Sequence, residues 1–463
     1  MRYYKQAPIQ EEFMNKFTSL IVFAFSLLPL ASGAQESLKA DGAIRMGDML
    51  TLDRCIDIAL QQQPALIASQ YNIRASESRV GEAQSAYYPQ VSVSGGYSRT
   101  KSSSISSNSS LFSGVGSSGG SGSSGGSGSF DQYTGSATLS QTIFDFGKTP
   151  AQVRIQKLNL DASRSDFDAT RSQTILSVKQ AYYGLLQSQR NVAVARETVT
   201  QFSQHLDQAK GFYEVGVKPK FDVIKAEVDL SNAKLNQITA DNALRIARVT
   251  LNNAVGLPDA PEYEIVDSMS YVKKDITLSQ AIETAFKNRP ELQATDLRVK
   301  ASEESITLAK TGYFPVVTGS AAFTRSSTTD TSFRDEDWTA GVTITFPIFS
   351  GFLTRHQVAE STAVFNAAKA NFDVLRQNVI LEVQQAALNL RAAADRIPTA
   401  ELAVQQATEN LDIANGRYTA GVGNPIEVTD AEVTYTNAKT AYTQALYDYN
   451  VAAANLDKAM GIR

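Results

Sequence analysis

Glu427 and Asp430 are two acidic residues near the end of the chain, and their spacing would let both carboxylates act at one site. They stand three positions apart at the expected start of a helix, so their side chains share one helix face. Carboxylates gathered around a narrow pore favour cations. The alternative is that acids in a first helical turn only complement the helix dipole, each stabilising the helix by about 0.3–1 kcal/mol.

No catalytic or cofactor motif accompanies these acids. The sequence has no HExxH, CxxC or Walker A pattern, and it predicts neither an enzyme nor a bound cofactor. His205 and His356 have no acidic or cysteine partner at ligand spacing, so we expect both on the surface and no metal site. Gly114, Gly116 and Gly119 match GxGxxG, but no helix pattern follows them, and no dinucleotide site is expected.

The composition does not point to nucleic acid as a partner. The chain has 463 residues, of which 43% are hydrophobic and 19% are charged, and its net charge is −4. A slightly acidic chain has no general attraction to nucleic acid. Cys55 is the single cysteine, which excludes an internal disulfide and predicts a buried thiol.

Residues 1–34 are typical of a secretory signal peptide. An apolar run precedes small residues that end at Ala34, and Met14 fits the start of such a signal better than Met1. The run is too short to cross a bilayer as a helix. No cysteine stands at the cleavage point, so no lipid anchor is expected. The rest of the chain is therefore expected to act outside the inner membrane.

The chain contains an internal repeat. Residues 51–99 align with residues 277–325 without a gap, and a second alignment pairs Tyr133 with Trp338 and continues to the end. One insertion in a Ser- and Gly-rich loop of the first copy separates the two alignments. Each copy is expected to run helix, strand, loop, strand and helix pair. The expected repeats are residues 35–270 and residues 271–463.

Each copy contains two segments in which apolar and small polar residues alternate, the period of a β-strand. Such segments suit membrane strands with one face to lipid and one to a wet lumen; the alternative is a soluble β-hairpin in each copy. Aromatic residues near the segment ends fit girdles at the membrane surface. The expected strands are about residues 89–99, 133–144, 315–326 and 337–348. The expected girdle residues are Tyr97, Tyr133, Phe323, Trp338 and Phe346.

Four strands cannot close a membrane barrel, because even the smallest such barrels have about eight. An open sheet edge cannot lie in lipid, since its backbone groups would lack hydrogen-bond partners. If these strands span a membrane, several chains must therefore pool them, and a trimer would supply about twelve.

Each copy also contains a long helical hairpin. We expect hairpins over about residues 150–257 and 352–460, with a kink at Pro398. Each connection repeats a glycine followed by a proline, which ends one helix and opens the next. In the second copy, small and large residues alternate along a heptad seam that permits close helix packing. The seam consists of Val428, Ala431, Tyr435, Ala438, Tyr442, Ala445, Tyr449 and Ala452.

The two Tyr-x-x-Gly-Val turns, at Tyr213 and Tyr418, the doubled Thr-Leu openings and the Ile-Phe strand exits resemble the TolC family of outer-membrane efflux proteins. The resemblance covers about residues 45–463. It implies a mixed α+β membrane protein and a homotrimer. The trimer would form a twelve-stranded transmembrane β-barrel in the outer membrane of a Gram-negative bacterium, with four strands per chain, continued by a long α-helical tunnel in the periplasm.

The resemblance also implies two sites at the closed periplasmic tip. In the family, acids matching Glu427 and Asp430 line the constriction, so these two residues and Asp222, the matching acid of the first copy, are expected at the gate. The family's tip-locking arginine is matched by Gly423, so another bond must close the tip, with Arg417 or Lys218 as candidates. The expected adaptor-docking residues are Gly216, Val217, Lys218, Gly421, Val422 and Gly423.

The leading hypothesis is a passive export duct for small molecules such as drugs and metabolites. A periplasmic adaptor and an inner-membrane pump of the RND or ABC class would be its partners, and the pump would supply the energy. Type I protein secretion uses the same kind of duct and remains an alternative. A further alternative is a non-conducting coiled-coil protein of the envelope, although such a spacer would not need aromatic-edged strands.

Overall fold

The computed structural model describes residues 47–101, 129–272, 276–327 and 335–462. These residues belong to one compact unit, Ile44–Arg463. The expected signal peptide, residues 1–34, lies outside the described residues, as does most of the Ser- and Gly-rich loop.

The two copies contain corresponding elements of matching length. Helices α3 and α7 have 21 residues each, and α4 and α8 have 67 residues each. The first copy consists of β1 (Met49–Leu50), α2 (Leu52–Gln62), α3 (Pro64–Gln84), η1 (Ser85–Tyr87), β2 (Gln90–Lys101), β3 (Ser129–Phe144), α4 (Lys148–Glu214), α5 (Lys220–Val255) and β4 (Glu264–Ile265). The second consists of α6 (Leu278–Asn288), α7 (Pro290–Lys310), η2 (Thr311–Tyr313), β5 (Val316–Ser327), β6 (Asp335–Thr345), α8 (Leu353–Thr419) and α9 (Pro425–Ala459).

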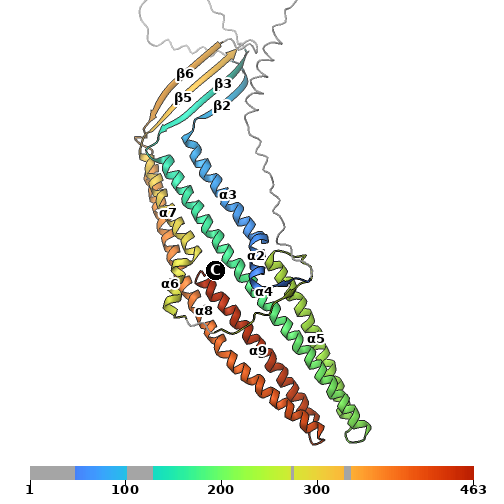
Figure 1. The fold of residues 1–463 in the computed structure, drawn as a ribbon. Helices are drawn as coiled ribbons and strands as arrows, with labels where there is room; N and C mark the ends of the chain where they lie inside the picture. The colour runs from blue at the N-terminus through green and yellow to red at the C-terminus, as the bar shows by residue number, and fades with distance from the viewer. Residues whose placement is uncertain (1–46, 102–128, 273–275, 328–334, 463) are drawn as a thin grey trace, which may run out of the picture. The chain divides into compact units, whose positions relative to one another are not determined.

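The four long strands form one antiparallel sheet in the order β2-β3-β5-β6 (Figure 1). The pairing of β3 with β5 joins the two copies, and it starts from Tyr133 opposite Ser327. Within the described residues, β2 and β6 each pair along one edge only. The sheet therefore ends in two strands whose outer backbone groups are available to another chain.

The sheet has one apolar face and one polar face, as the alternation of the sequence predicts. On the apolar face, Ala137 lies opposite Phe323, which in turn lies opposite Trp338. On the polar face, the hydroxyl groups of Ser92 and Thr138 are 2.6 Å apart. The apolar face is exposed in the single chain, with Trp338 77% accessible. An exposed apolar face of this extent indicates that something other than water covers it.

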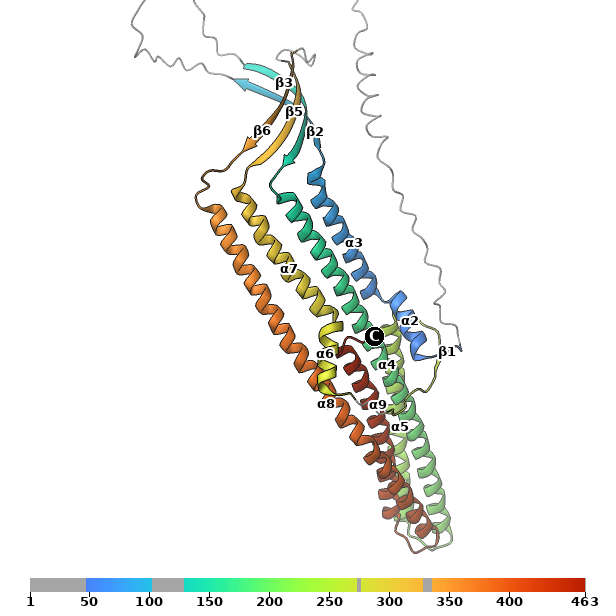
Figure 2. The same cartoon turned by 60° about the vertical axis from the view of Figure 1, so that its left-hand side comes forward.

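Below the sheet, α3 and α4 descend from the strands of the first copy, and α7 and α8 from those of the second (Figures 1 and 2). Helix α4 packs against α3, α5, α7 and α9, so it is the element that joins the two copies. Helix α8 continues through Pro398 and packs along α7 and α9. None of the helices in the described ranges combines the length and apolar character that crossing a membrane requires.

The main core lies where α4, α8 and α9 meet the short segments near β1 and β4. Tyr182 is fully buried there, and its hydroxyl group lies 2.6 Å from the carbonyl oxygen of Val266. Cys55 is buried in the same cluster, which confirms the predicted buried thiol. Along α9, the seam residues Val428, Ala431 and Tyr435 are buried against α8, as the heptad pattern predicts.

Candidate functional site: the paired hairpin tips

The turns of the two hairpins have the same backbone construction. Gly216 and Gly421 adopt φ angles of +74° and +80°, a left-handed conformation that glycine adopts without strain. The amide of Val217 donates to the carbonyl of Phe212 at 2.9 Å, and the matching amide of Val422 donates to the carbonyl of Arg417 at 3.2 Å. The repeated Gly-Val sequence therefore builds the same tight turn twice.

The two turns present apolar side chains to solvent. Val215, Val217 and Val422 are exposed, and Tyr213 is partly exposed just before the first turn. The predicted docking residues Val217 and Val422 thus lie at the surface of the two tips. Gly423 lies deeper, because a Cβ atom added there would come within 2.6 Å of the backbone nitrogen of Tyr418.

Lys218 connects the first tip to the second. Its Nζ atom donates a hydrogen bond of 3.1 Å to the carbonyl oxygen of Gly423 and lies 5.6 Å from the centre of the Tyr418 ring. Arg417, the other candidate for closing the tip, instead forms an ion pair of 3.4 Å with Glu427 inside its own hairpin. Of these two candidates, Lys218 forms a bond between the hairpins of one chain, whereas Arg417 pairs within its own hairpin.

The three predicted gate acids do not share one environment. Glu427 and Asp430 lie exposed in the first turns of α9, which Asn424 caps by accepting a hydrogen bond of 3.0 Å from the amide of Ile426. Asp222 is only 5% exposed. Burial, with the charge of Asp222, raises the pKa of Tyr418, which indicates that Asp222 faces the interior between the hairpins.

Above the tips, polar bonds hold α9 against the first hairpin. Glu197 of α4 accepts hydrogen bonds of 2.8 Å from the Tyr435 hydroxyl group and from Lys439. The hydroxyl groups of Thr198 and Thr436 are 2.9 Å apart. Polar groups therefore carry these contacts between α9 and the first hairpin.

A cluster of buried ionisable groups lies between these bonds and the tips. Asp229 of α5 accepts hydrogen bonds of 2.6 Å from Lys225 and of 3.0 Å from Thr429. Glu432 is only 1% exposed, and burial together with the negative charge of Asp229 raises its pKa to about 8. The carboxyl group of Glu432 is therefore mostly protonated at neutral pH.

His205 belongs to this cluster, so the expectation that it lies on the surface is wrong. Its side chain is 4% exposed and its ring lies 4.8 Å from that of Tyr418. Burial lowers its pKa, while the charges of Asp229 and Asp222 partly oppose this effect. His356 is exposed, as expected.

Sequence reasoning missed Asp229 and Glu432 because each lies among other charged residues on a helix that looks solvated. The local signal is that each acid stands next to an apolar residue of its helix, Asp229 beside Leu230 and Glu432 beside the seam residue Ala431. Their burial depends on which helix covers that side of the seam, and the sequence alone does not reveal this.

The predicted girdle residues lie near both ends of the sheet. Tyr97 and Tyr133 face each other with ring centres 5.0 Å apart, and Phe323 lies opposite Trp338 four positions further along the strands. Phe346 lies just beyond the other end of β6. The sequence prediction missed further exposed aromatic residues at that second end. They are Tyr87, Tyr88, Phe144, Phe146, Tyr313, Phe314, Phe349 and Phe352.

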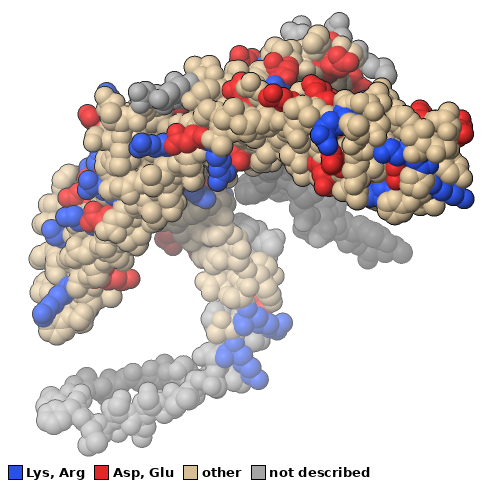
Figure 3. Space-filling view, turned by 90° about the horizontal axis from the view of Figure 1, so that it is seen from below, with Lys and Arg blue, Asp and Glu red and all other residues tan. Residues whose placement is uncertain are grey.

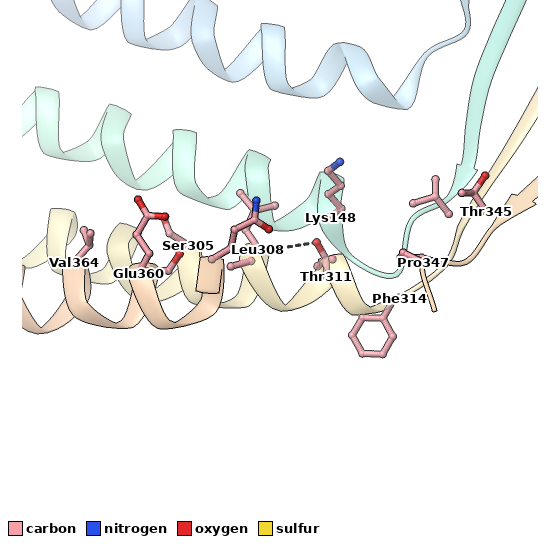
Figure 4. Close-up of a pocket in the computed structure, with 14 residues that line it drawn as sticks. Lys148, Ser305, Leu308, Thr311, Phe314, Thr345, Pro347, Glu360 and Val364 are labelled. Atoms are coloured by element: carbon pink, nitrogen blue, oxygen red, sulfur yellow. Dashed lines mark hydrogen bonds between the residues drawn. The ribbon is translucent and has the colours of Figure 1, made fainter. Parts of the chain in front are cut away.

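The described residues contain no group of three or more His, Cys, Asp or Glu residues that could hold a metal ion. A groove where α7 and α8 approach the sheet is lined mainly by apolar and hydroxyl side chains, with Lys148 and Glu360 as its charged residues (Figure 4). On the face seen from below, positive and negative side chains are intermixed, which gives no single-sign patch for nucleic acid (Figure 3).

Known proteins resemble the chain over most of its length. It is 22% identical to outer membrane protein TolC of Vibrio cholerae over 87% of this chain and 89% of that protein. It is 23% identical to the alkaline protease secretion protein AprF of Pseudomonas aeruginosa over 72% of this chain and 70% of that protein. Among solved structures, the CmeC outer membrane channel of Campylobacter jejuni shares the fold with a TM-score of 0.74 at 19% identity, covering 89% of this chain and 85% of that one.

The model of one family matches both copies of the repeat. This family is described as outer membrane efflux protein, and the match comprises residues 55–257 and 281–462. Both hairpins and all four long strands fall within these matched ranges. The chain therefore belongs to the outer membrane efflux protein family, whose members are export ducts of the outer membrane.

Proposed function

We propose that the chain forms a homotrimeric outer-membrane duct that serves a tripartite export system and carries small molecules. The observation that carries this proposal is the sheet: four strands with an exposed apolar face and two edges that are free within the described residues. One chain cannot close such a sheet in lipid. Three chains would pool about twelve strands and leave no edge.

The long helices support the same assembly. On α5, the apolar residues Ile224, Val228, Leu235 and Ile238 are exposed in the single chain. On α8, Val374, Leu381 and Leu388 recur every seven residues and are also exposed. Exposed apolar residues at heptad spacing form the seams by which helices of neighbouring chains pack.

The hairpin tips are the proposed contact with a periplasmic adaptor, through Gly216, Val217, Lys218, Gly421, Val422 and Gly423. Exposed valines at a tight turn offer a small apolar knob that a partner can cover. An inner-membrane pump of the RND or ABC class would supply the energy. Glu427 and Asp430 are proposed to form the gate of the duct, while buried Asp222 would act inside the hairpin contact.

The remaining proposals concern processing and the membrane surface. We propose that residues 1–34 are removed as a signal peptide, and that repeat 1 spans 35–270 and repeat 2 spans 271–463. The aromatic residues at the two sheet ends are proposed to lie at the two surfaces of the membrane, because aromatic rings favour that interface.

Protein secretion is the second candidate cargo route, favoured by the similarity to a protein named for alkaline protease secretion. Deletion of the gene separates the two routes. Intracellular accumulation of a fluorescent dye supports small-molecule efflux, whereas loss of one protein from the medium with unchanged dye export supports secretion.

Recordings of the purified protein in a planar lipid bilayer test the duct itself. The proposal predicts discrete conductance steps from trimers. Trimers that insert without any ion conductance would instead identify a structural protein of the envelope, the third hypothesis.

A further inference from the structure

Glu432 lies in the contact between the two hairpins, with a hydrogen bond between the hairpins on either side of it along α9. One turn before it, Thr429 bonds to Asp229 of α5 at 3.0 Å, and one turn after it, Thr436 bonds to Thr198 of α4 at 2.9 Å. Both bonds join α9 to the first hairpin. Glu432 itself is 1% exposed, and its Oε2 atom has no hydrogen-bond partner within the described residues.

Within the described residues, no lysine, arginine or histidine forms an ion pair with Glu432. From α5, Asp229 brings a negative charge close to Glu432, and Lys225 pairs with Asp229 at 2.6 Å. His205 of α4 is close enough to Asp229 for its charge to act on the imidazole, and its ring lies 4.8 Å from that of Tyr418. Buried polar atoms of His205 and Tyr418 have no partner in the described residues. A neutral carboxyl group is tolerated in these surroundings, but a carboxylate would be buried without a counter-charge.

We propose that Glu432 is a proton-controlled latch of the tip: when neutral it allows α9 to pack against α4 and α5, and when ionised it drives the second hairpin away from the first. This inference rests on the proposed function, because it regulates the same tip through which the duct would open. The latch differs from the gate acids Glu427 and Asp430, which are exposed.

The sign of the effect follows from the two states of Glu432. In the packed state its pKa is about 8, and in a released, hydrated state it returns toward the ordinary value of 4.5. The packed state thus holds the proton at pH values where the released state has lost it. Packing is most favourable at low pH and weakens as the pH rises from about 4.5 to about 8, by up to about tenfold per pH unit.

His205 acts in the opposite direction. Burial lowers its pKa below the ordinary value of 6.5, so the packed state loses stability as the pH falls below that value. Below pH 6.5 His205 therefore opposes the effect of Glu432. The interval between pH 6.5 and 8 lies above this opposing effect, and this interval is where the latch should act.

Hydrogen exchange of the full-length purified protein tests the latch without any need for conduction. After correction for the intrinsic rate, amides of residues 427–436 should exchange about tenfold faster per pH unit between pH 6.5 and 8. Glu432→Gln, which keeps the shape and removes the charge, should abolish this rise. Glu432→Met should do the same, and it serves if the glutamine variant folds poorly.

Two control variants test whether the pH-dependent rise in exchange arises from Glu432. Glu409→Gln removes an exposed acid from α8 and should leave the profile of the wild type unchanged. His205→Gln should keep the rise above pH 6.5. A rise that persists in both Glu432 variants, or one that disappears in His205→Gln, would overturn the latch.

Bilayer recordings separate this inference from the proposed function. Conduction that increases with pH in the wild type but not in Glu432→Gln supports both. A protein that does not conduct but shows Glu432-dependent exchange refutes the duct and retains the latch. A protein that conducts with exchange independent of Glu432 retains the duct and refutes the latch.

Discussion

The Nζ atom of Lys218 lies 3.1 Å from the carbonyl oxygen of Gly423, and the two residues occupy the same position in the two copies of the repeat. The bond exists because the copies differ there. Lysine supplies a donor long enough to reach the other hairpin. Glycine is required opposite it, since a Cβ atom at position 423 would meet the backbone of Tyr418.

Replacing Lys218 by methionine should loosen the tip. A partly exposed, charge-assisted hydrogen bond contributes about 1 kcal/mol, which corresponds to roughly a fivefold rise in open probability in bilayer recordings. Lys210→Met is the matched control, because Lys210 pairs at 4.0 Å with Glu227 inside the first hairpin. Equal effects from the two variants would show that Lys218 does not connect the tips.

Removal of the gate charges should change selectivity and not assembly. The double variant Glu427→Gln with Asp430→Asn should lower the preference for cations, measured as the reversal potential in a salt gradient. Glu409→Gln with Asp412→Asn is the control, since these acids also stand three apart and are exposed, but on α8. An unchanged reversal potential in the gate variant would contradict the gate assignment.

Substitutions of Gly421 test whether this residue contributes to adaptor docking or only to the geometry of the turn. Its φ angle of +80° imposes a similar backbone cost of about 1 kcal/mol on Asp and Asn, and no atom lies within 4 Å of an added Cβ. Gly421→Asp should abolish export in cells while trimers remain in the membrane, because it places a charge beside the apolar knob at Val422. Gly421→Asn should retain much of the export. Loss of trimers in both variants would assign Gly421 a structural role only; Gly216 permits the same pair of substitutions.

Neighbouring residues of β6 test which face of the sheet meets lipid. Val342 lies on the apolar face and Thr343 on the polar face. Arginine at position 342 should cost about 2–4 kcal/mol in the lipid interior and reduce the yield of membrane-inserted trimer. Thr343→Arg should be tolerated and alter conductance. The opposite ranking of the two yields would reverse the assignment of the faces.

The sequence by itself determines the local structure of this protein. The alternation in the four strand segments predicts the apolar and polar faces of the sheet. Glycine at the turns determines where each hairpin reverses, because only a residue tolerant of positive φ fits there. The heptad spacing around Tyr435 predicts which side of α9 is buried. All of these signals act between residues that are near one another in the chain.

The tertiary structure decides which distant surfaces meet. Asp229 and Thr429 are 200 positions apart, and no periodicity relates them. Their contact arises because α4 connects the copies and brings α9 against the first hairpin. The same packing buries His205, which we expected on the surface from its neighbours in the sequence. It also excludes water from Glu432. Burial and charge state depend on the covering helix, and that is a property of the assembled fold.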